Sequence, residues 1–106
     1  MEDMIKAMSK SSKVSQRKYA ELMQAFSGFA NEVHKEGALS LKMKELIAIG
    51  IAVVKNCELC MDAHVKEALQ AGATREEVME ACYVATLMDG GPSLAHTSYI
   101  AKILEG

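Results

Sequence analysis

The segment Leu41–Lys55, with the sequence LKMKELIAIGIAVVK, decides the fold. Its first turns mix apolar and charged side chains at helical spacing, and Leu46–Val54 is apolar on every side. Ser40 is a suitable N-cap, so we predict a helix over Leu41–Lys55. A helix that is apolar all round has to be covered on all sides, which a chain of 106 residues can hardly do alone. We therefore expect an oligomer whose interface covers this helix.

One alternative for this segment is a buried strand. Ile47, Ile49, Ile51 and Val53 alternate along it, and a strand here would feed a helix that starts at Cys57, as in the thioredoxin arrangement. No other segment resembles a strand, however, and a single strand cannot make a sheet. The sequence therefore predicts an all-α fold.

Helical patterns continue on both sides of this segment. Apolar residues recur at three- and four-residue spacing upstream, and turn residues and a capping box divide the downstream part. We expect residues 1–13 to be a flexible N-terminal segment and residues 14–106 to form a single helical domain. The expected helices besides Leu41–Lys55 are Val14–His34, Cys57–Ala71, Thr74–Met88 and a last one from Pro92 or Ser93 to Leu104.

Composition limits the possible partners. The chain carries 12 basic and 14 acidic side chains, for a net charge of −2, which argues against nucleic acid or an anionic membrane as the main partner. No apolar run is long enough to span a bilayer, and the polar N-terminus has no signal-peptide pattern. We expect a cytoplasmic protein, in which paired cysteines more often serve catalysis or metal binding than covalent stapling.

The chemistry is concentrated at Cys57-Glu58-Leu59-Cys60 and His64. If Cys57 opens a helix, the unpaired N–H groups and the helix dipole favour its thiolate. Cys60 lies one turn on, within reach of a disulfide, and His64 at i+4 leans toward Cys60 and can take its proton. Helix position therefore favours Cys57 as the more acidic thiol while His64 favours Cys60, and the order of attack stays open.

Glu45 joins this group by geometry. In an antiparallel hairpin of the two central helices, Glu45 lies about ten residues before the turn and His64 about eight after it, so at about 1.5 Å per residue they stand at nearly the same height. A carboxylate beside an imidazole orients it or relays its proton. The alternative for Glu45 is a solvated place beside Lys42 and Lys44.

Metal binding and purely structural roles are the alternative interpretations of these side chains. Cys57, Cys60 and His64 offer three zinc ligands, with a fourth to come from Cys82, His96 or His34. Cys82 sits in an apolar stretch and is expected in the core. His96 and Tyr99 are expected at the surface or in the core rather than in a pocket, and His34 is expected as a cation at a helix C-terminus.

The pattern Glu45-x11-Cys57-x2-Cys60-x3-His64 resembles the redox motif of the carboxymuconolactone decarboxylase-like superfamily, in its alkyl hydroperoxidase D-like branch. The resemblance covers roughly residues 39–104. It implies an all-helical single domain that assembles into trimers or hexamers. It also implies that Cys57 and Cys60 cycle between dithiol and disulfide, with Glu45 and His64 in a proton relay. The hydroperoxidase D proteins carry a His just before the second cysteine, where this chain has Leu59.

We therefore expect an enzyme that reduces disulfides or peroxides through Cys57 and Cys60, assisted by Glu45 and His64. It needs no bound organic cofactor or metal, and an external dithiol or a protein reductant regenerates it. One alternative is a zinc-stabilised helical module without enzymatic activity. Another is a decarboxylase or small-molecule binder on the same scaffold, acting through His96 or Tyr99.

Overall fold

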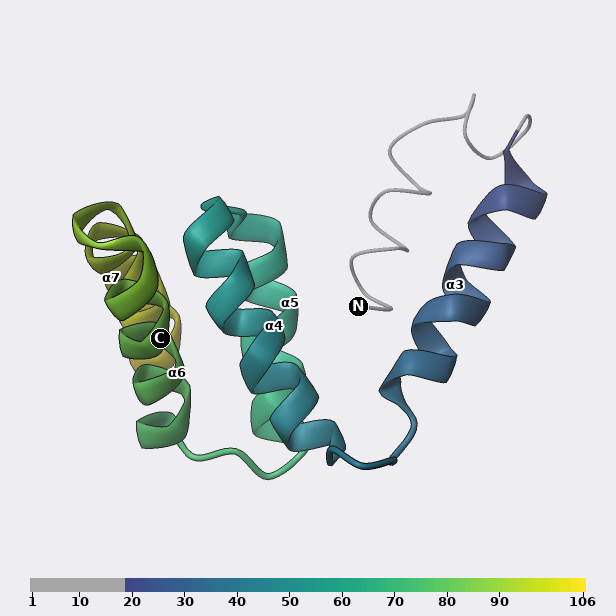
Figure 1. The fold of residues 1–106 in the computed structure, drawn as a ribbon, viewed down its shortest axis with the longest axis horizontal. Coiled ribbons are helices and arrows are strands. Elements are labelled where there is room, and N and C mark those ends of the chain that lie inside the picture. The colour runs from purple at the N-terminus through teal and green to yellow at the C-terminus, as the bar shows by residue number, and fades with distance from the viewer. Residues whose placement is uncertain (1–18) are drawn as a thin grey trace.

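The computed structural model of the chain describes residues 19–106. The predicted flexible segment 1–13 and the first turn of the predicted helix from Val14 lie outside this range. Within it the chain is helical, with no strand, so the strand alternative for residues 46–54 is wrong. The helices, coloured along the chain in Figure 1, are α3 (Ala20–His34), α4 (Leu41–Lys55), α5 (Glu58–Gln70), α6 (Arg75–Asp89) and α7 (Gly91–Glu105).

The predicted bounds of α4 are confirmed. Ser40 is its N-cap, with the hydroxyl oxygen accepting a hydrogen bond from the Met43 N–H at 3.1 Å. Asn56 ends the helix in the left-handed conformation, at φ 53°. Asparagine tolerates this conformation better than most residues, so the chain can leave α4 and turn directly toward α5.

The capping box before α6 is also confirmed, since Thr74 and Glu77 each accept from the other's backbone N–H. The break before α7 is shorter than the gap left between the predicted helices, which ended at Met88 and resumed at Pro92 or Ser93. Gly90 alone separates the two helices, because its φ of +86° turns the chain within one residue. Pro92 then lies in the first turn of α7, where its missing N–H costs no helical hydrogen bond.

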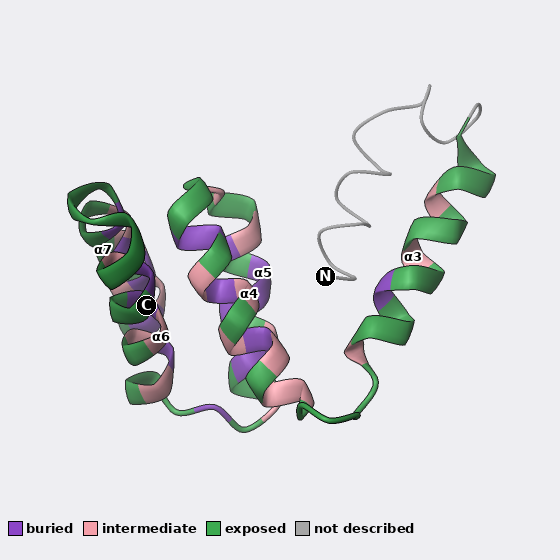
Figure 2. Ribbon diagram, viewed as in Figure 1, coloured by how far each residue is buried: buried purple, intermediate pink, exposed green. Residues whose placement is uncertain are grey.

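The core lies among α4, α5, α6 and α7, with α4 packed against each of the other three. Most of the buried residues belong to these four helices, and Ala30 of α3 and Ala73 between α5 and α6 are the exceptions (Figure 2). Ile49 and Val53 of α4 are fully buried, whereas Ile47 and Ile51 on its other side are about half exposed. The described part of the chain, residues 19–106, therefore covers only one side of α4.

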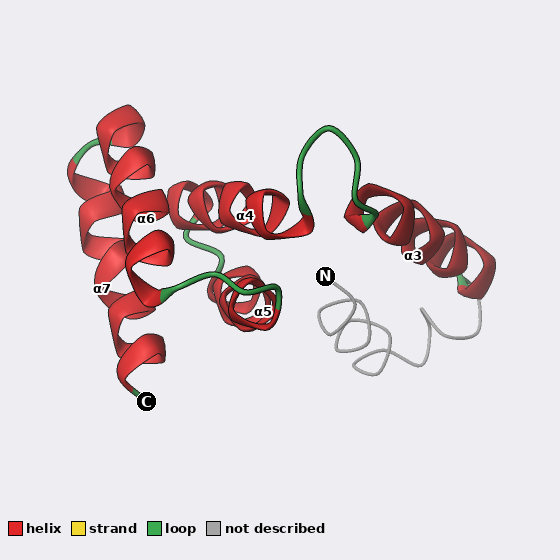
Figure 3. Cartoon of the chain, turned by 90° about the horizontal axis from the view of Figure 1, so that it is seen from below, coloured by secondary structure: helices red, strands yellow, loops and turns green. Residues whose placement is uncertain are grey.

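α3 stands apart from α6 and α7, with α4 and α5 between them in both Figure 1 and Figure 3. An exposed apolar stripe runs along α3 at three- and four-residue spacing. Its members are Tyr19, Leu22, Phe26, Phe29 and Val33. None of the helices in residues 19–106 has the length and apolarity needed to cross a bilayer.

Candidate active site

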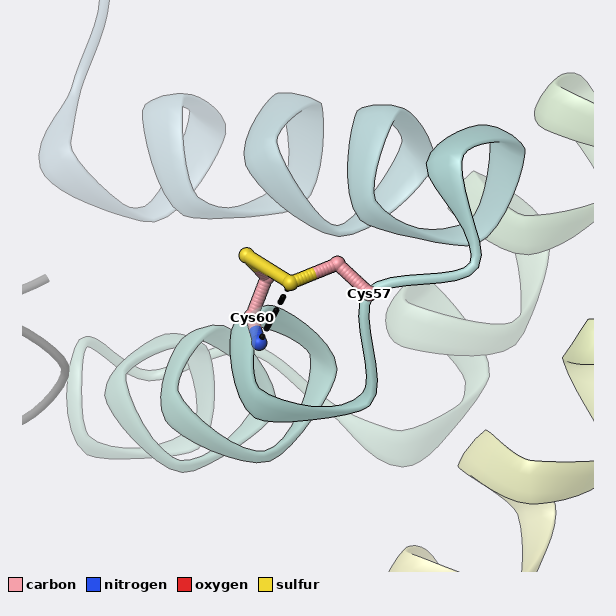
Figure 4. Close-up of a disulfide and its surroundings, with 2 residues drawn as sticks. All are labelled: Cys57 and Cys60. Atoms are coloured by element: carbon pink, nitrogen blue, oxygen red, sulfur yellow. Dashed lines mark hydrogen bonds between the residues drawn. A yellow bond between two sulfur atoms is a disulfide. The ribbon is translucent and has the colours of Figure 1, made fainter.

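Cys57 and Cys60 form a disulfide at the start of α5, with Cα atoms 5.2 Å apart. Cys57 is the N-cap residue, and its Sγ accepts a hydrogen bond from the Cys60 N–H at 3.2 Å. The two sulfur atoms lie in the angle between α4 and α5 (Figure 4). Both cysteines are partly exposed, so a substrate can reach them. The predicted position of the first sulfur at a helix N-terminus is confirmed.

The turn between α4 and α5 produces this placement. After the left-handed Asn56, Cys57 is extended, and its N–H donates to the Ala52 carbonyl at 3.1 Å. That hydrogen bond fixes the direction in which the chain enters α5. Because Cys57 is outside the helix while Cys60 is within its first turn, both side chains reach the same end of α5.

Glu45 and His64 meet across the α4–α5 interface, as the sequence spacing predicts. Glu45 Oε2 lies 2.7 Å from His64 Nδ1, and the two residues are only 1% and 4% exposed. Glu45 is therefore not the solvated residue that the sequence offered as an alternative. This contact is made by Nδ1 of His64, and Nε2, the second ring nitrogen, takes no part in it.

The sequence did not indicate two further members of this cluster, His34 and Glu67. His34 Nε2 lies 2.7 Å from Glu45 Oε1, and Glu67 Oε2 lies 3.7 Å from both His34 Nε2 and His64 Nδ1. His34 was expected only as a charge at a helix end, and its Nδ1 does contact the Ala30 carbonyl at 2.6 Å. Glu67 was detectable, because it stands at i+3 from His64 on α5.

The cluster keeps Glu45 ionised in spite of its burial. Desolvation acts to raise the pKa of this carboxyl. The hydrogen bond and electrostatic interaction with His64, a hydrogen bond with Glu67 and the electrostatic interaction with His34 act in the opposite direction. Their combined effect outweighs desolvation, so the pKa of Glu45 lies below its ordinary value of 4.5.

The remaining candidates lie elsewhere. Cys82 is fully buried, as predicted, and burial raises the pKa of its thiol to about 11. His96 Nδ1 contacts the Val53 carbonyl at 2.6 Å, and the Tyr99 hydroxyl donates to Asp62 at 3.0 Å. Both side chains thus have hydrogen-bonding partners on α4 or α5 and are partly exposed, which agrees with the structural roles predicted for them.

The zinc set suggested by the sequence is not the one assembled here, because Cys57 and Cys60 are bonded to each other. Among residues 19–106, the group whose geometry suits a metal ion consists of His34, Glu45 and Glu67. One ligand atom from each lies within 4.8 Å of the others. Of the zinc ligands that the sequence offered, His34 alone belongs to this group.

An all-helical domain with a Cys-x-x-Cys disulfide beside a buried carboxylate–imidazole pair defines the class of protein. A model of the carboxymuconolactone decarboxylase family matches residues 20–102, and the chain belongs to that family. Over 86 residues it is 38% identical to the uncharacterised protein 4 of the cox locus of Paracoccus denitrificans. The aligned region covers 81% of this chain and 78% of the relative.

Solved structures show the same fold. A carboxymuconolactone decarboxylase family protein from Legionella pneumophila superimposes with a TM-score of 0.84 at 36% identity, covering 98% of this chain and 93% of its own. A family member from Thermotoga maritima, described as possibly involved in antioxidative response, has a TM-score of 0.79 at 25% identity over 97% and 87% of the two chains. The predicted family and fold class are both confirmed.

Proposed function

We propose that this protein is a thiol–disulfide oxidoreductase whose Cys57–Cys60 pair reduces a disulfide or a hydroperoxide. The observation that carries the proposal is the disulfide at the N-terminus of α5, one turn from a buried Glu45–His64 pair. A structural disulfide needs no such pair beside it, whereas a dithiol that must gain and lose protons does. The antioxidative role suggested for the Thermotoga maritima relative agrees with this activity.

The reaction with a disulfide substrate takes two steps. One thiolate attacks a substrate sulfur, the substrate S–S bond breaks, and the leaving thiolate takes up a proton. The second cysteine then attacks the mixed disulfide, which forms the Cys57–Cys60 bond and releases the second substrate thiol. Two electrons and two protons pass from the protein to the substrate, and an external dithiol or protein reductant returns them.

With a hydroperoxide, the first thiolate attacks the terminal oxygen and becomes a sulfenic acid as the alcohol leaves. The second thiol condenses with that sulfenic acid, expelling water and forming the same disulfide. Leu59 stands where the hydroperoxidase D proteins carry a His, so this route has one fewer proton donor here. Because that donor would serve the leaving alcohol, its absence bears on peroxides more than on disulfides.

His64 and Glu45 would handle the protons. Glu45 Oε2 lies 2.7 Å from His64 Nδ1, so an Nδ1–H donated to this carboxylate would leave Nε2 as the nitrogen that takes up a proton. His64 then takes the thiol proton of Cys60, one turn away on the same helix face. The carboxylate stabilises the imidazolium that forms, as a buried anion does for a general base.

The test is turnover with a small disulfide and with a hydroperoxide, each in the presence of a dithiol. Cys57→Ser and Cys60→Ser are each expected to abolish turnover, because neither leaves a pair that can close. Cys82→Ala is the matched control, since that buried cysteine lies outside the pair. Full activity in either motif variant would refute the proposal. Activity that survives both replacements would point instead to a decarboxylase or a small-molecule binder.

We also propose that the protein works as a homo-oligomer, either a trimer or a hexamer. A groove of about 580 Å³ lies between α4 and α6, lined by apolar side chains that include Ile47, Ile51, Val84 and Met88. These residues are exposed in the single chain. Contiguous apolar surface of this kind is typical of protein interfaces. The apolar stripe of α3 gives a second surface that the described part of the chain leaves exposed.

A further inference from the structure

The cluster of His34, Glu45, His64 and Glu67 has a composition that the proposed redox chemistry does not require. Only Glu45 and His64 are needed to move a thiol proton. The structure adds a second imidazole from α3 and a second carboxylate from α5. Two imidazoles and two carboxylates from three helices are the ligand types that bind zinc and related divalent ions.

We propose that this cluster is a binding site for one divalent transition-metal ion, with zinc as the reference ion. The ligands would be one atom each of His34, Glu45 and Glu67, which lie within 4.8 Å of one another. The two carboxylates and a neutral imidazole carry a charge of −2, which such an ion balances.

The distances fit this assignment. A tetrahedral zinc ion with ligands at about 2.0–2.2 Å holds them about 3.3–3.6 Å from one another. The imidazole–carboxylate distances in the cluster fall on both sides of that range. Each imidazole nitrogen lies 2.7 Å from an oxygen of Glu45 and 3.7 Å from Glu67 Oε2. For His34, shifts of less than an ångström relative to each carboxylate would bring Nε2 into that range.

The orientation of His34 gives independent support. Its Nδ1 donates to the Ala30 carbonyl at 2.6 Å, and its Nε2 is directed at the carboxylates. Metal-binding histidines usually anchor their second ring nitrogen in this way, because the hydrogen bond fixes the tautomer and the ring plane. The side chains of His34 and Glu67 are 27% and 19% exposed, so an ion can enter from their side of the cluster.

The experiment is equilibrium dialysis of the full chain against Zn²⁺, and against Co²⁺ as a spectroscopic probe. The protein is kept oxidised, so that Cys57 and Cys60 are bonded and only the buried Cys82, with its raised pKa of about 11, remains a thiol. We expect one ion per chain and a visible Co²⁺ absorption without a thiolate charge-transfer band. Affinity should fall as the pH is lowered, because protons compete for the His34 imidazole.

Three variants complete the test. His34→Gln and Glu67→Gln should each weaken binding at least tenfold, with helicity checked by circular dichroism. His96→Gln is the matched control, because His96 also contacts a backbone carbonyl through Nδ1 but lies outside the cluster. Its affinity should stay within twofold of the unsubstituted protein.

No retained ion in the oxidised protein, or equal binding by all three variants, would overturn the metal site. Binding that appears only after reduction would also overturn it, because the cysteines would then be the ligands. The measurement needs no substrate, so its failure is distinct from failure of the oxidoreductase proposal. If the protein binds the ion and the Cys57→Ser variant is still active, the metal site is supported and the proposed redox function is refuted.

Discussion

His34, the last residue of α3, shares the carboxylate of Glu45 with His64, so that one buried anion holds an imidazole on each of its oxygens. The contact ties a helix that otherwise stands apart to the middle of the candidate active site. Lys44 strengthens the same junction, since its ammonium donates to the carbonyls of Val33 and Lys35 at 2.7 and 2.6 Å. The end of α3 is thus positioned by polar groups of α4.

Glu45→Gln should lower the free energy of unfolding by about 2 kcal/mol at neutral pH, because a hydrogen-bonded carboxylate is replaced by a neutral amide. The pKa of Glu45 is lowered in the folded state, so its contribution is present above the ordinary value of 4.5. That contribution is lost as the pH falls through the folded-state pKa. Denaturant titrations of both proteins across this acid range should show their stabilities converging. A constant difference would mean that ionisation of Glu45 is not the cause.

Cys57 should be alkylated before Cys60 when the reduced protein meets limiting iodoacetamide at neutral pH. Its Sγ accepts the Cys60 N–H at the N-terminus of α5, and this position stabilises a thiolate by about 0.3–1 kcal/mol, or about two- to fivefold in thiolate fraction. Peptide mass spectrometry would locate the first label. Preferential labelling of Cys60 would show that activation by His64 dominates.

Cys82 should remain unlabelled in the native protein under the same conditions. It has no exposed surface, and burial raises the pKa of its thiol to about 11, so the thiolate is nearly absent at neutral pH. Denaturant should release it, which gives a third label in the reduced and unfolded chain. Rapid native labelling would mean that the core between α6 and α7 opens readily.

Ile51→Glu should dissociate the proposed oligomer, because it places a charge among the apolar side chains of the α4–α6 groove. Leu69→Glu on α5 is the control, since Leu69 is an exposed apolar residue outside that groove. Sedimentation equilibrium should give a trimer or hexamer for the control and a monomer for Ile51→Glu. A monomeric unsubstituted protein would refute the assembly itself.

Regular structure explains which parts of the site were predictable. Glu45 and His64 lie on two consecutive helices joined by a tight turn, so the constant helical rise was enough to bring them to one height. The start of α4 followed from the capping chemistry of Ser40, and the start of α6 followed from Thr74 with Glu77.

Helical spacing could not predict that His34 lies beside Glu45. It depends on the path of residues 35–40, which form no helix and carry no periodic pattern. The same limit applies to α4, because an all-apolar segment does not show which of its sides the chain itself covers. Ile49 and Ile51 are chemically alike, yet the first is buried and the second is 54% exposed.

The hydrogen bond between the Cys60 N–H and Cys57 Sγ bears on the reduction potential of the pair. A sulfur at the N-cap of α5 is better accommodated as a thiolate than as a thiol, so the helix stabilises the reduced state. Stabilising the dithiol raises the potential and makes the disulfide easier to reduce. In the proposed catalytic cycle, the first turn of α5 would therefore favour regeneration by a weak reductant, at some cost in the driving force available for reducing the substrate.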